Sequence, residues 1–468
     1  MKQMLVSMVL AWVTFSGGLA HSQSSTTQSP AATSSGIDGT WIGALDTGAI
    51  ELHVVFHIVT TADGLHADLD SPDQGARGIS ASSVTRQESS LKIEVQKIGG
   101  VFEGKVASDG KSIDGTWTQN GARLPLLLKP VNNATQLERK RPQNPTKPYP
   151  YREEEVSYDN KAQHVTLAGT LTVPQGKGPF PAVLLIPGSG AHDRDETLLG
   201  HKPFLVLADY LTRQGIAVLR VDDRGVGKST GSMANATTAD LATDAEAGVA
   251  YLKTRREIDA HKIGLVGHSE GGAIAPMVAA RNPDVAFIVM MAGPGVPGDE
   301  ILVAQTEKIA EAAGKSHDDA EKAGAKEREL LALVKNGGDQ ATLENQLRAK
   351  LEGDVPKNQL TMQVKMILSP WFRYFISYDP STALRKVKCP VLALIGDKDL
   401  QVPPDQNLPA IRKALEEGGN RHFTVEELSG LNHLFQTAKT GAPSEYAQIE
   451  ETMSPVAMGK IGGWILKQ

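Results

Sequence analysis

Between about residues 180 and 430, short apolar segments alternate with longer stretches of helical character. Fully apolar segments of this length favour strands that are buried on both faces, which is typical of parallel sheets covered by helices. We therefore predict an α/β fold with a mostly parallel sheet. The expected strands are residues 182–186, 216–221, 263–266, 285–291, 391–395 and 423–428, and helices are expected near 203–214, 238–255 and 272–281.

One connection in this pattern is much longer than the others. About a hundred residues separate Met291 from Val391, and they are rich in Ala, Glu, Lys and Leu at helical spacing. A compact domain rarely contains a structureless loop of this length. We expect a helical cap at about 296–385, over the carboxyl ends of the strands. Its aromatic run at 370–375 either lines a pocket or packs against the sheet.

The N-terminal third predicts several further segments. An apolar stretch ending near Ala20 is typical of a signal peptide (1–20), which implies a periplasmic or secreted protein. A disordered spacer rich in Ser, Thr and Gln (21–35) is expected next. Short alternating segments then predict an antiparallel β-domain, either a barrel or a sandwich, over 36–131. Residues 132–152 indicate a linker, which leaves 153–468 for the sheet and its cap.

Composition excludes some classes of partner. The net charge of −6 offers no basic face, so we expect no nucleic-acid partner. No segment after the N-terminal stretch is apolar enough to span a membrane. The single cysteine, Cys389, precedes an apolar strand and is expected to be a small buried hydrophobe. His53 and His57 are expected to be surface histidines with hydrogen-bond partners rather than metal ligands.

The segment IGLVGHSEGG (263–272) predicts a reactive serine. An apolar strand stops at Gly267-His268-Ser269-Glu270-Gly271, and a small-residue helix is expected to follow. In this G-x-S-x-G pattern the serine occupies a strained turn that exposes its hydroxyl at the edge of the sheet. The flanking glycines are needed because side chains there would collide with the tight turn. Ser269 is therefore the candidate nucleophile.

A serine hydroxyl needs a base to accept its proton and an acid to orient that base. The candidate acid is Asp399, in GDKDLQVP (396–403), immediately after an apolar strand. Asp397 competes with it, although turn chemistry after Gly396 is the expected role of Asp397. The candidate base is His433, in GLNHLFQ (430–436), beyond the last strand. The chain order Ser, Asp, His, with each residue just past a strand, supports this assignment.

An oxyanion hole requires two backbone N–H donors aimed at the developing charge. One donor is expected from Glu270, which follows the nucleophile. The other is expected from the loop Pro187-Gly188-Ser189-Gly190, after the strand at 182–186. Ser189 is the candidate donor, with Gly190 as the alternative.

Five segments together resemble the α/β-hydrolase superfamily, and within it bacterial secreted esterases and serine-aminopeptidase-like hydrolases. These segments are GSGAHDRDE (188–196), VDDRGVGKST (221–230), GHSEGG (267–272), GDKDLQVP and GLNHLFQ, and the resemblance covers about 153–467. It implies acyl transfer from an ester, thioester or amide to water through an acyl-serine, with no metal or organic cofactor. The chain has Pro187-Gly188 where many members have His-Gly, so the second oxyanion donor stays open.

We predict a serine carboxylic ester hydrolase that acts on a small-molecule ester. A peptidase, of the aminopeptidase or prolyl-oligopeptidase-like kind, is the alternative, with Glu270 or Glu300 binding the peptide amine. A thioesterase is less favoured because acyl-CoA is cytoplasmic, whereas the signal peptide predicts a protein outside the cytoplasm. The β-domain is expected either to contact a glycan or the cell envelope, or to shield the active site.

Residues 225–230 mimic the end of a phosphate-binding P-loop. The complete motif requires a glycine where this chain has Asp222. We expect instead a structural turn in which Asp222 or Arg224 braces loops near the active site.

Overall fold

The structure is a computed structural model that describes residues 36–468 except 47–50, 75, 120–121, 132–140 and 356. The predicted signal peptide (1–20) and spacer (21–35) lie outside the described residues. The chain forms two compact units. The first reaches Lys140 and includes the short segments 197–201 and 351–363, and the second comprises the remainder.

The first unit contains a single nine-stranded antiparallel sheet, in the order β4-β3-β2-β1-β9-β8-β7-β6-β5. Phe56 on β2 packs against Phe102 on β7 and Trp117 on β8, with ring centroids 5.8 and 6.1 Å apart. Because β2 is not adjacent to β7 or β8, the sheet must curl so that its two halves face each other. The prediction of an antiparallel β-domain is confirmed. The strands are β1 (Gly39–Asp46), β2 (Glu51–Thr61), β3 (Gly64–Ser71), β4 (Ala76–Ser80), β5 (Ser83–Gln87), β6 (Ser90–Val95), β7 (Gly100–Val106), β8 (Ile113–Gln119) and β9 (Ala122–Pro130).

Both histidines of β2 have acidic partners. His53 Nδ1 lies 2.8 Å from Asp73 Oδ2, and His57 Nε2 lies 2.9 Å from Asp70 Oδ2. Among the described residues, no group of three or more His, Cys, Asp or Glu side chains is arranged to hold a metal ion. These histidines therefore act within the β-domain as partners of buried or half-buried carboxylates.

The second unit is built on an eight-stranded sheet, in the order β10-β11-β13-β12-β14-β15-β16-β17. The first three strands pair antiparallel, and all later pairs are parallel. The central strands are almost entirely buried, as their continuous apolar sequences predict. The strands are β10 (Arg152–Asn160), β11 (Val165–Val173), β12 (Phe180–Ile186), β13 (Ala217–Val221), β14 (Ile258–His268), β15 (Phe287–Met291), β16 (Val391–Gly396) and β17 (Phe423–Leu428).

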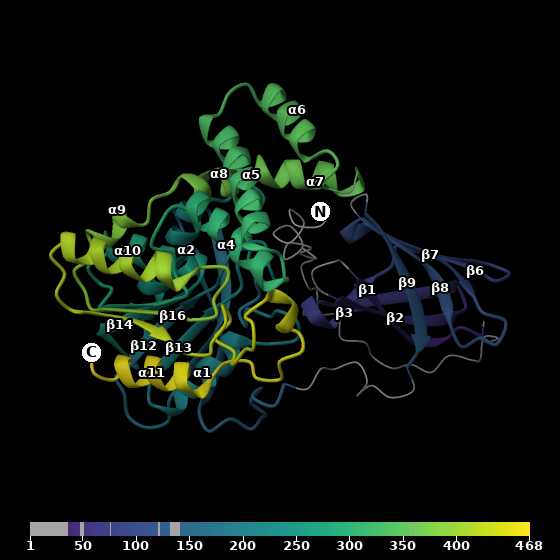
Figure 1. Cartoon of the computed structure of the whole chain (residues 1–468). Coiled ribbons are helices and arrows are strands. Elements are labelled where there is room, and N and C mark those ends of the chain that lie inside the picture. Colours follow the sequence, from purple (N-terminus) through teal and green to yellow (C-terminus); the bar gives the residue numbers. More distant parts are fainter. Residues whose placement is uncertain (1–35, 47–50, 75, 120–121, 132–140, 356) are drawn as a thin grey trace. The chain divides into compact units, whose positions relative to one another are not determined.

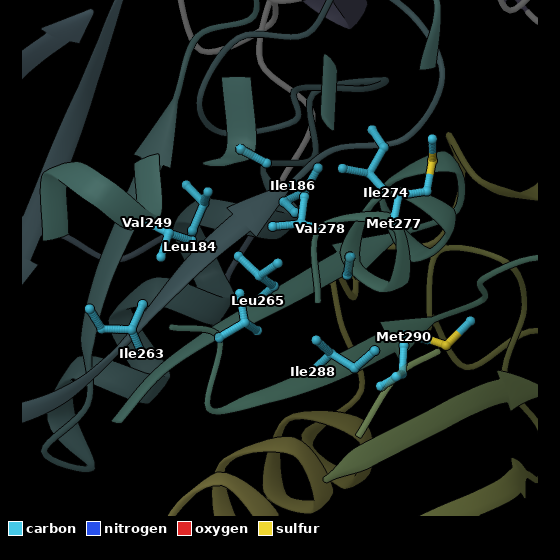
Figure 2. Packing of buried hydrophobic residues seen from close by; sticks show 14 of the residues in the cluster. Leu184, Ile186, Val249, Ile263, Leu265, Ile274, Met277, Val278, Ile288 and Met290 are labelled. Atoms are coloured by element: carbon cyan, nitrogen blue, oxygen red, sulfur yellow. The ribbon is translucent and has the colours of Figure 1, made fainter. Parts of the chain in front are cut away.

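Helices cover both faces of this sheet. On one face, residues of α2 (Thr238–Lys253), α3 (Glu270–Ala279) and α10 (Pro404–Glu417) share a buried cluster with the strands. Figure 1 labels α2 and α10, and Figure 2 shows part of the cluster, including Val249 of α2 and Ile274 of α3. On the other face, α1 (Pro203–Arg213) and α11 (Pro455–Ile465) form a second cluster. The sheet is thus the middle layer of three, as predicted.

A helical insertion separates β15 from β16. It consists of α4 (Gly298–Ala312), α5 (His317–Asn336), α6 (Gln340–Leu351), α7 (Lys357–Ile367), α8 (Pro370–Ser377) and α9 (Ser381–Leu384). Within it, α4 packs on α5 and α8. Among the described residues, no helix has the length and hydropathy required to cross a bilayer.

The described part of the predicted linker forms hydrogen bonds with other residues of the second unit. The Arg141 guanidinium donates to the backbone oxygens of Ala447 and Ile449 at 3.0 Å, and Arg141 is only 9% exposed. Gln143 exchanges hydrogen bonds with the backbone at Thr452 and Met453. Sequence composition alone did not indicate these contacts, because the partners of Arg141 and Gln143 lie about 300 residues further along the chain.

Candidate active site

Ser269 lies on a strained turn between β14 and α3. Its backbone has φ 51° and ψ −115°, a conformation that residues other than glycine rarely adopt. Ser269 N donates to Met291 O at 2.8 Å, which ties the turn to the neighbouring strand. A methyl group on Gly267 would collide with Gly271 O, and one on Gly271 would collide with Ile186 O. The glycines are therefore required by close backbone contacts, as the motif predicts.

Asp399 and His433 are brought together at the same edge of the sheet. His433 Nδ1 lies 2.8 Å from Asp399 Oδ2, and the two residues are 5% and 1% exposed. Asp399 Oδ1 accepts the backbone N–H groups of Gln401 and Val402 at 2.9 and 2.8 Å. These contacts fix the carboxylate in one orientation, with one oxygen on the backbone and the other on the histidine.

Asp397, the competing acid, lies elsewhere. It is exposed, and its oxygens accept Gly430 N–H at 2.6 Å and the Ser429 hydroxyl at 3.2 Å. It therefore supports the turn that precedes His433 and has no hydrogen bond to the histidine ring among the described contacts. This geometry favours the turn role that the sequence indicated for Asp397.

The loop that carries His433 lies against the nucleophile turn. His268, which precedes Ser269, has its Nε2 3.0 Å from the backbone oxygen of His433. The ring centroids of these two histidines are 5.0 Å apart. The structure thus brings His433 and Asp399 together beside the turn that carries Ser269, at the carboxyl ends of β14, β16 and β17.

The loop after β12 passes directly beside Ser269. A methyl group on Gly188 would lie 3.3 Å from Ser269 Cβ, a tight contact that the glycine avoids. Gly188 N–H donates to Glu196 Oε1 at 2.8 Å and is therefore engaged. Ser189 and Gly190 follow it, and the His192 ring contacts Ser189 O at 3.0 Å. The loop backbone is held in place next to the serine.

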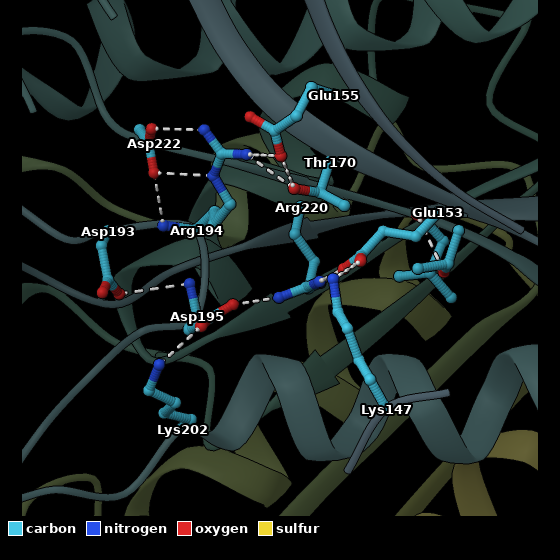
Figure 3. A network of polar contacts seen from close by, with 12 residues as sticks. Lys147, Glu153, Glu155, Thr170, Asp193, Arg194, Asp195, Lys202, Arg220 and Asp222 are labelled. Atoms are coloured by element: carbon cyan, nitrogen blue, oxygen red, sulfur yellow. Dashed lines mark hydrogen bonds and ion pairs between the residues drawn. The ribbon is translucent and has the colours of Figure 1, made fainter. Parts of the chain in front are cut away.

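A polar network anchors the same loop to the sheet (Figure 3). The Arg194 guanidinium contacts Asp222 Oδ1 and Oδ2 at 3.0 and 2.8 Å and Glu155 Oε1 at 2.7 Å. Arg194 N–H also donates to Asp222 at 2.9 Å, and Asp222 is 4% exposed. Asp222 therefore braces the loop that the sequence assigned to the oxyanion hole. Arg224 has a different partner, Asp244 on α2, at 2.8 Å.

The segment that resembles a P-loop is structural. The Ser229 hydroxyl donates to Asp222 O at 2.7 Å and accepts Ala168 N–H at 2.9 Å. A methyl group on Gly227 would collide with the Asp222 carboxylate. The hydroxyl and the turn are thus occupied by contacts with the sheet, in agreement with the predicted turn.

Glu270 directly follows the nucleophile, and its side chain is buried. Its Oε1 accepts the Thr238 hydroxyl at 2.6 Å and Trp371 Nε1–H at 2.9 Å, and the residue is 3% exposed. Burial raises the pKa of Glu270, against the opposing effect of hydrogen bonds from Thr238, Trp371 and Ser189. Trp371 also stacks on Phe375 at 5.4 Å. The aromatic run therefore reaches the nucleophile turn through Trp371.

Two buried residues in this cluster were not singled out from the sequence. Glu196 closes the segment GSGAHDRDE, and His268 lies inside GHSEGG. Their side chains meet at 2.8 Å although they are 72 residues apart. The sequence did contain one signal for this pair: each residue is an ionisable side chain inside a motif whose other residues form a tight turn.

The sheet order, the helices on both faces and the serine on a strained strand-to-helix turn define the class of protein: it is an α/β-hydrolase. A profile of the Hydrolase_4 family, described as "Serine aminopeptidase, S33", matches residues 202–437, half of the chain. The chain belongs to this family, and the prediction of an α/β-hydrolase enzyme is confirmed.

Individual relatives cover different shares of the chain. Esterase EstD of Thermotoga maritima is 26% identical over 302 residues, which are 64% of this chain and 66% of EstD, just under two thirds of it. An uncharacterized 31.7 kDa protein of Escherichia coli is 25% identical over 275 residues, or 56% of this chain and 90% of that protein. The solved esterase Pf2001 of Pyrococcus furiosus aligns with a TM-score of 0.43 at 16% identity, over 68% of this chain and 91% of Pf2001.

Proposed function

We propose that this protein hydrolyses small-molecule carboxylic esters through an acyl-serine intermediate, with Ser269, His433 and Asp399 as its catalytic triad. The hydrogen bond of 2.8 Å between His433 and the buried Asp399, beside the strained Ser269 turn, carries the proposal. An imidazole whose Nδ1–H is held by a carboxylate presents its Nε2 as a base. The esterase name of the relative EstD supports the ester substrate.

The reaction proceeds in two halves. His433 Nε2 accepts the Ser269 proton as the serine oxygen attacks the ester carbonyl carbon, and the carbonyl oxygen becomes an alkoxide. Backbone N–H groups of Glu270 and Ser189, with Gly190 as the alternative to Ser189, stabilise this alkoxide. The alkoxide collapses, the alcohol leaves with the proton from His433, and water then attacks the acyl-serine by the same route. No step requires a metal or an organic cofactor.

The acidic side chains near the serine favour an ester over a peptide with a free amine. Binding an ammonium group requires an available carboxylate. Glu270 Oε1 accepts hydrogen bonds from Thr238 and Trp371, its Oε2 is buried without a hydrogen-bond partner, and burial raises the pKa of this carboxyl group. Glu300 is exposed at the start of α4. Burial thus disfavours the charged form of Glu270 that an ammonium group requires, and Glu300 is too exposed to hold an amine away from water.

The experiment compares Ser269→Ala with the unchanged protein on p-nitrophenyl acetate and butyrate, and includes alanyl and prolyl p-nitroanilides. We expect ester turnover that Ser269→Ala abolishes, with little cleavage of the anilides. Ester turnover that survives Ser269→Ala would rule out the serine mechanism. Faster cleavage of the anilides than of the esters would instead identify a peptidase, which the family description names.

We further propose that the protein acts outside the cytoplasm, on the basis of the apolar N-terminal sequence. We propose that the β-domain then contacts a glycan or the cell envelope. Fractionation of cells that express the full chain tests the location: the proposal expects processed protein in the periplasm or medium, and full-length protein in the cytoplasm contradicts it. Binding of the full chain to isolated cell envelope tests the proposed contact of the β-domain, and an absence of binding contradicts it.

A further inference from the structure

Glu196 and His268 form a buried pair that the proposed mechanism does not use. Glu196 lies in the loop between β12 and α1, and His268 is the last residue of β14, directly before the nucleophile. His268 Nδ1 lies 2.8 Å from Glu196 Oε1, and the two residues are 6% and 5% exposed. A buried acid and a buried base therefore lie in contact with each other, directly beside the turn that carries Ser269.

Both ring nitrogens of His268 face acceptors. Nδ1 faces the Glu196 carboxyl group, and Nε2 faces the backbone oxygen of His433 at 3.0 Å. A carbonyl oxygen can only accept, and a neutral imidazole has a single N–H. Glu196 Oε1 also accepts Gly188 N–H at 2.8 Å, which favours its ionised form. An imidazolium paired with a carboxylate satisfies all three hydrogen bonds at once.

The charges of the pair agree with this geometry. Burial alone would lower the pKa of His268, but contact with Glu196 and the carbonyl of His433 raises it above its usual range. Burial would likewise raise the pKa of Glu196, but His268, His192 and Gly188 N–H lower it. Each partner therefore stabilises the charged form of the other.

We propose that the Glu196–His268 ion pair positions both halves of the catalytic machinery, by fixing the oxyanion loop through Gly188 and the base through the backbone of His433. This inference rests on the proposed function, because it assigns the pair to the reaction of Ser269. Glu196 and His268 are positioning residues, because each acts through the backbone of another residue: Glu196 through Gly188 and His268 through His433.

At the loop end, the pair controls the peptide next to the oxyanion donor. Gly188 N–H points to Glu196, and Gly188 itself lies against Ser269. Because one peptide is fixed, the direction of the following N–H groups, those of Ser189 and Gly190, is restricted. An oxyanion hole depends on donors that are oriented before the charge develops. Loss of Glu196 should therefore lower kcat more than it raises KM.

At the base end, the pair also sets the charge around His433. The His268 and His433 rings are 5.0 Å apart, so an imidazolium at His268 disfavours a second one at His433. Other ionisable groups face the pair from the surrounding segments: Glu196 and His192 after β12, Asp223 after β13 and Asp399 after β16. Replacing His268 by a neutral side chain removes this positive charge, and the acid limb of kcat/KM should move up by about one pH unit.

Two substitutions of His268 each keep a different hydrogen bond of the pair. In His268→Asn the short amide can keep the bond to Glu196 and loses the one to His433, whereas in His268→Gln the longer amide can reach the carbonyl of His433. Both remove the imidazolium. His261→Asn is the matched control, because His261 is an exposed residue of the same strand. Each variant is measured for kcat and KM on p-nitrophenyl butyrate across pH 5–9, beside its thermal unfolding midpoint.

We expect both His268 variants to lower kcat by about 10- to 100-fold through misplacement of the reacting groups, with an acid limb shifted upward, and His261→Asn to leave the limb unchanged. In the unchanged protein, ¹⁵N-labelled histidine should show two protonated ring nitrogens for His268 at pH 7.5. Folded variants with an unmoved acid limb and unaltered kcat would overturn the inference, as would a neutral His268. Loss of activity that follows only the folded fraction would also overturn it. Failure of the proposed function is seen separately, as turnover that survives Ser269→Ala.

Discussion

Replacing Asp399 by Asn should remove the base without removing the fold. Asp399 Oδ1 accepts two backbone N–H groups, from Gln401 and Val402, and Oδ2 accepts His433 Nδ1–H. An asparagine of the same shape must turn its oxygen to the two N–H groups, since buried donors need acceptors. Its NH₂ group then faces His433 Nδ1, which must become an acceptor. The proton moves to Nε2, where a base is required.

The wrong tautomer is expected to lower kcat by about 10⁴-fold, the size of effect seen for this change in serine proteases. That factor corresponds to about 5 kcal/mol of lost transition-state stabilisation. The backbone contacts of residue 399 are retained, so the free energy of unfolding should change little. Stopped-flow or steady-state hydrolysis of p-nitrophenyl butyrate measures kcat, and urea unfolding measures stability.

Asp397→Asn is the matched control. Asp397 is exposed and contacts Ser429 and Gly430 instead of the histidine ring. Most of the activity should remain in this variant. The reasoning is refuted if Asp399→Asn, correctly folded, keeps more than a tenth of the kcat, or if Asp397→Asn suffers the larger loss.

Two further predictions concern stability. Gly271→Ala should prevent stable folding, because its methyl group would collide with Ile186 O. Gly463→Ala on α11, where the added methyl group meets open space, should be neutral or stabilising by about 0.5–1 kcal/mol. Equal unfolding midpoints for the two variants would contradict this prediction. Burial raises the pKa of Glu327 on α5 to about 7, so the unfolded chain loses this proton at a lower pH than the folded one, and stability falls between pH 4.5 and 7. The difference in free energy of unfolding between Glu327→Gln and the unchanged protein should therefore favour the variant by up to roughly 3 kcal/mol more at pH 8 than at pH 4. Urea unfolding measures this difference, and an equal value at both pH values would refute the prediction.

The order of the proposed triad could be predicted from sequence because each member follows an apolar strand. Parallel strands bring their carboxyl ends to one edge of the sheet, so Ser269, Asp399 and His433 had to meet if the strands were assigned correctly. The choice of Asp399 over Asp397 also followed from its place in the turn. These inferences depend on local patterns and on one topological rule.

Contacts between distant segments could not be predicted in this way. Glu196 meets His268 across 72 residues, and Trp371 meets Glu270 across 101. Neither pair has a sequence spacing that identifies it, since the contacts arise from loops that the sheet brings together. In the β-domain, alternation predicted which side of each strand is buried but not the partner strand, so a barrel and a sandwich remained equivalent. The contact between Phe56 and Phe102 shows how the sheet curls.

The central claim is that Ser269 carries the acyl group. A fluorophosphonate probe forms a stable bond only with an activated serine, and mass spectrometry of the digested protein locates it. We predict a single phosphonylated peptide, modified at Ser269, and no label when Asp399→Asn replaces the unchanged protein under the same conditions. A label on another serine, or full ester turnover by protein whose Ser269 is completely phosphonylated, would contradict the mechanism.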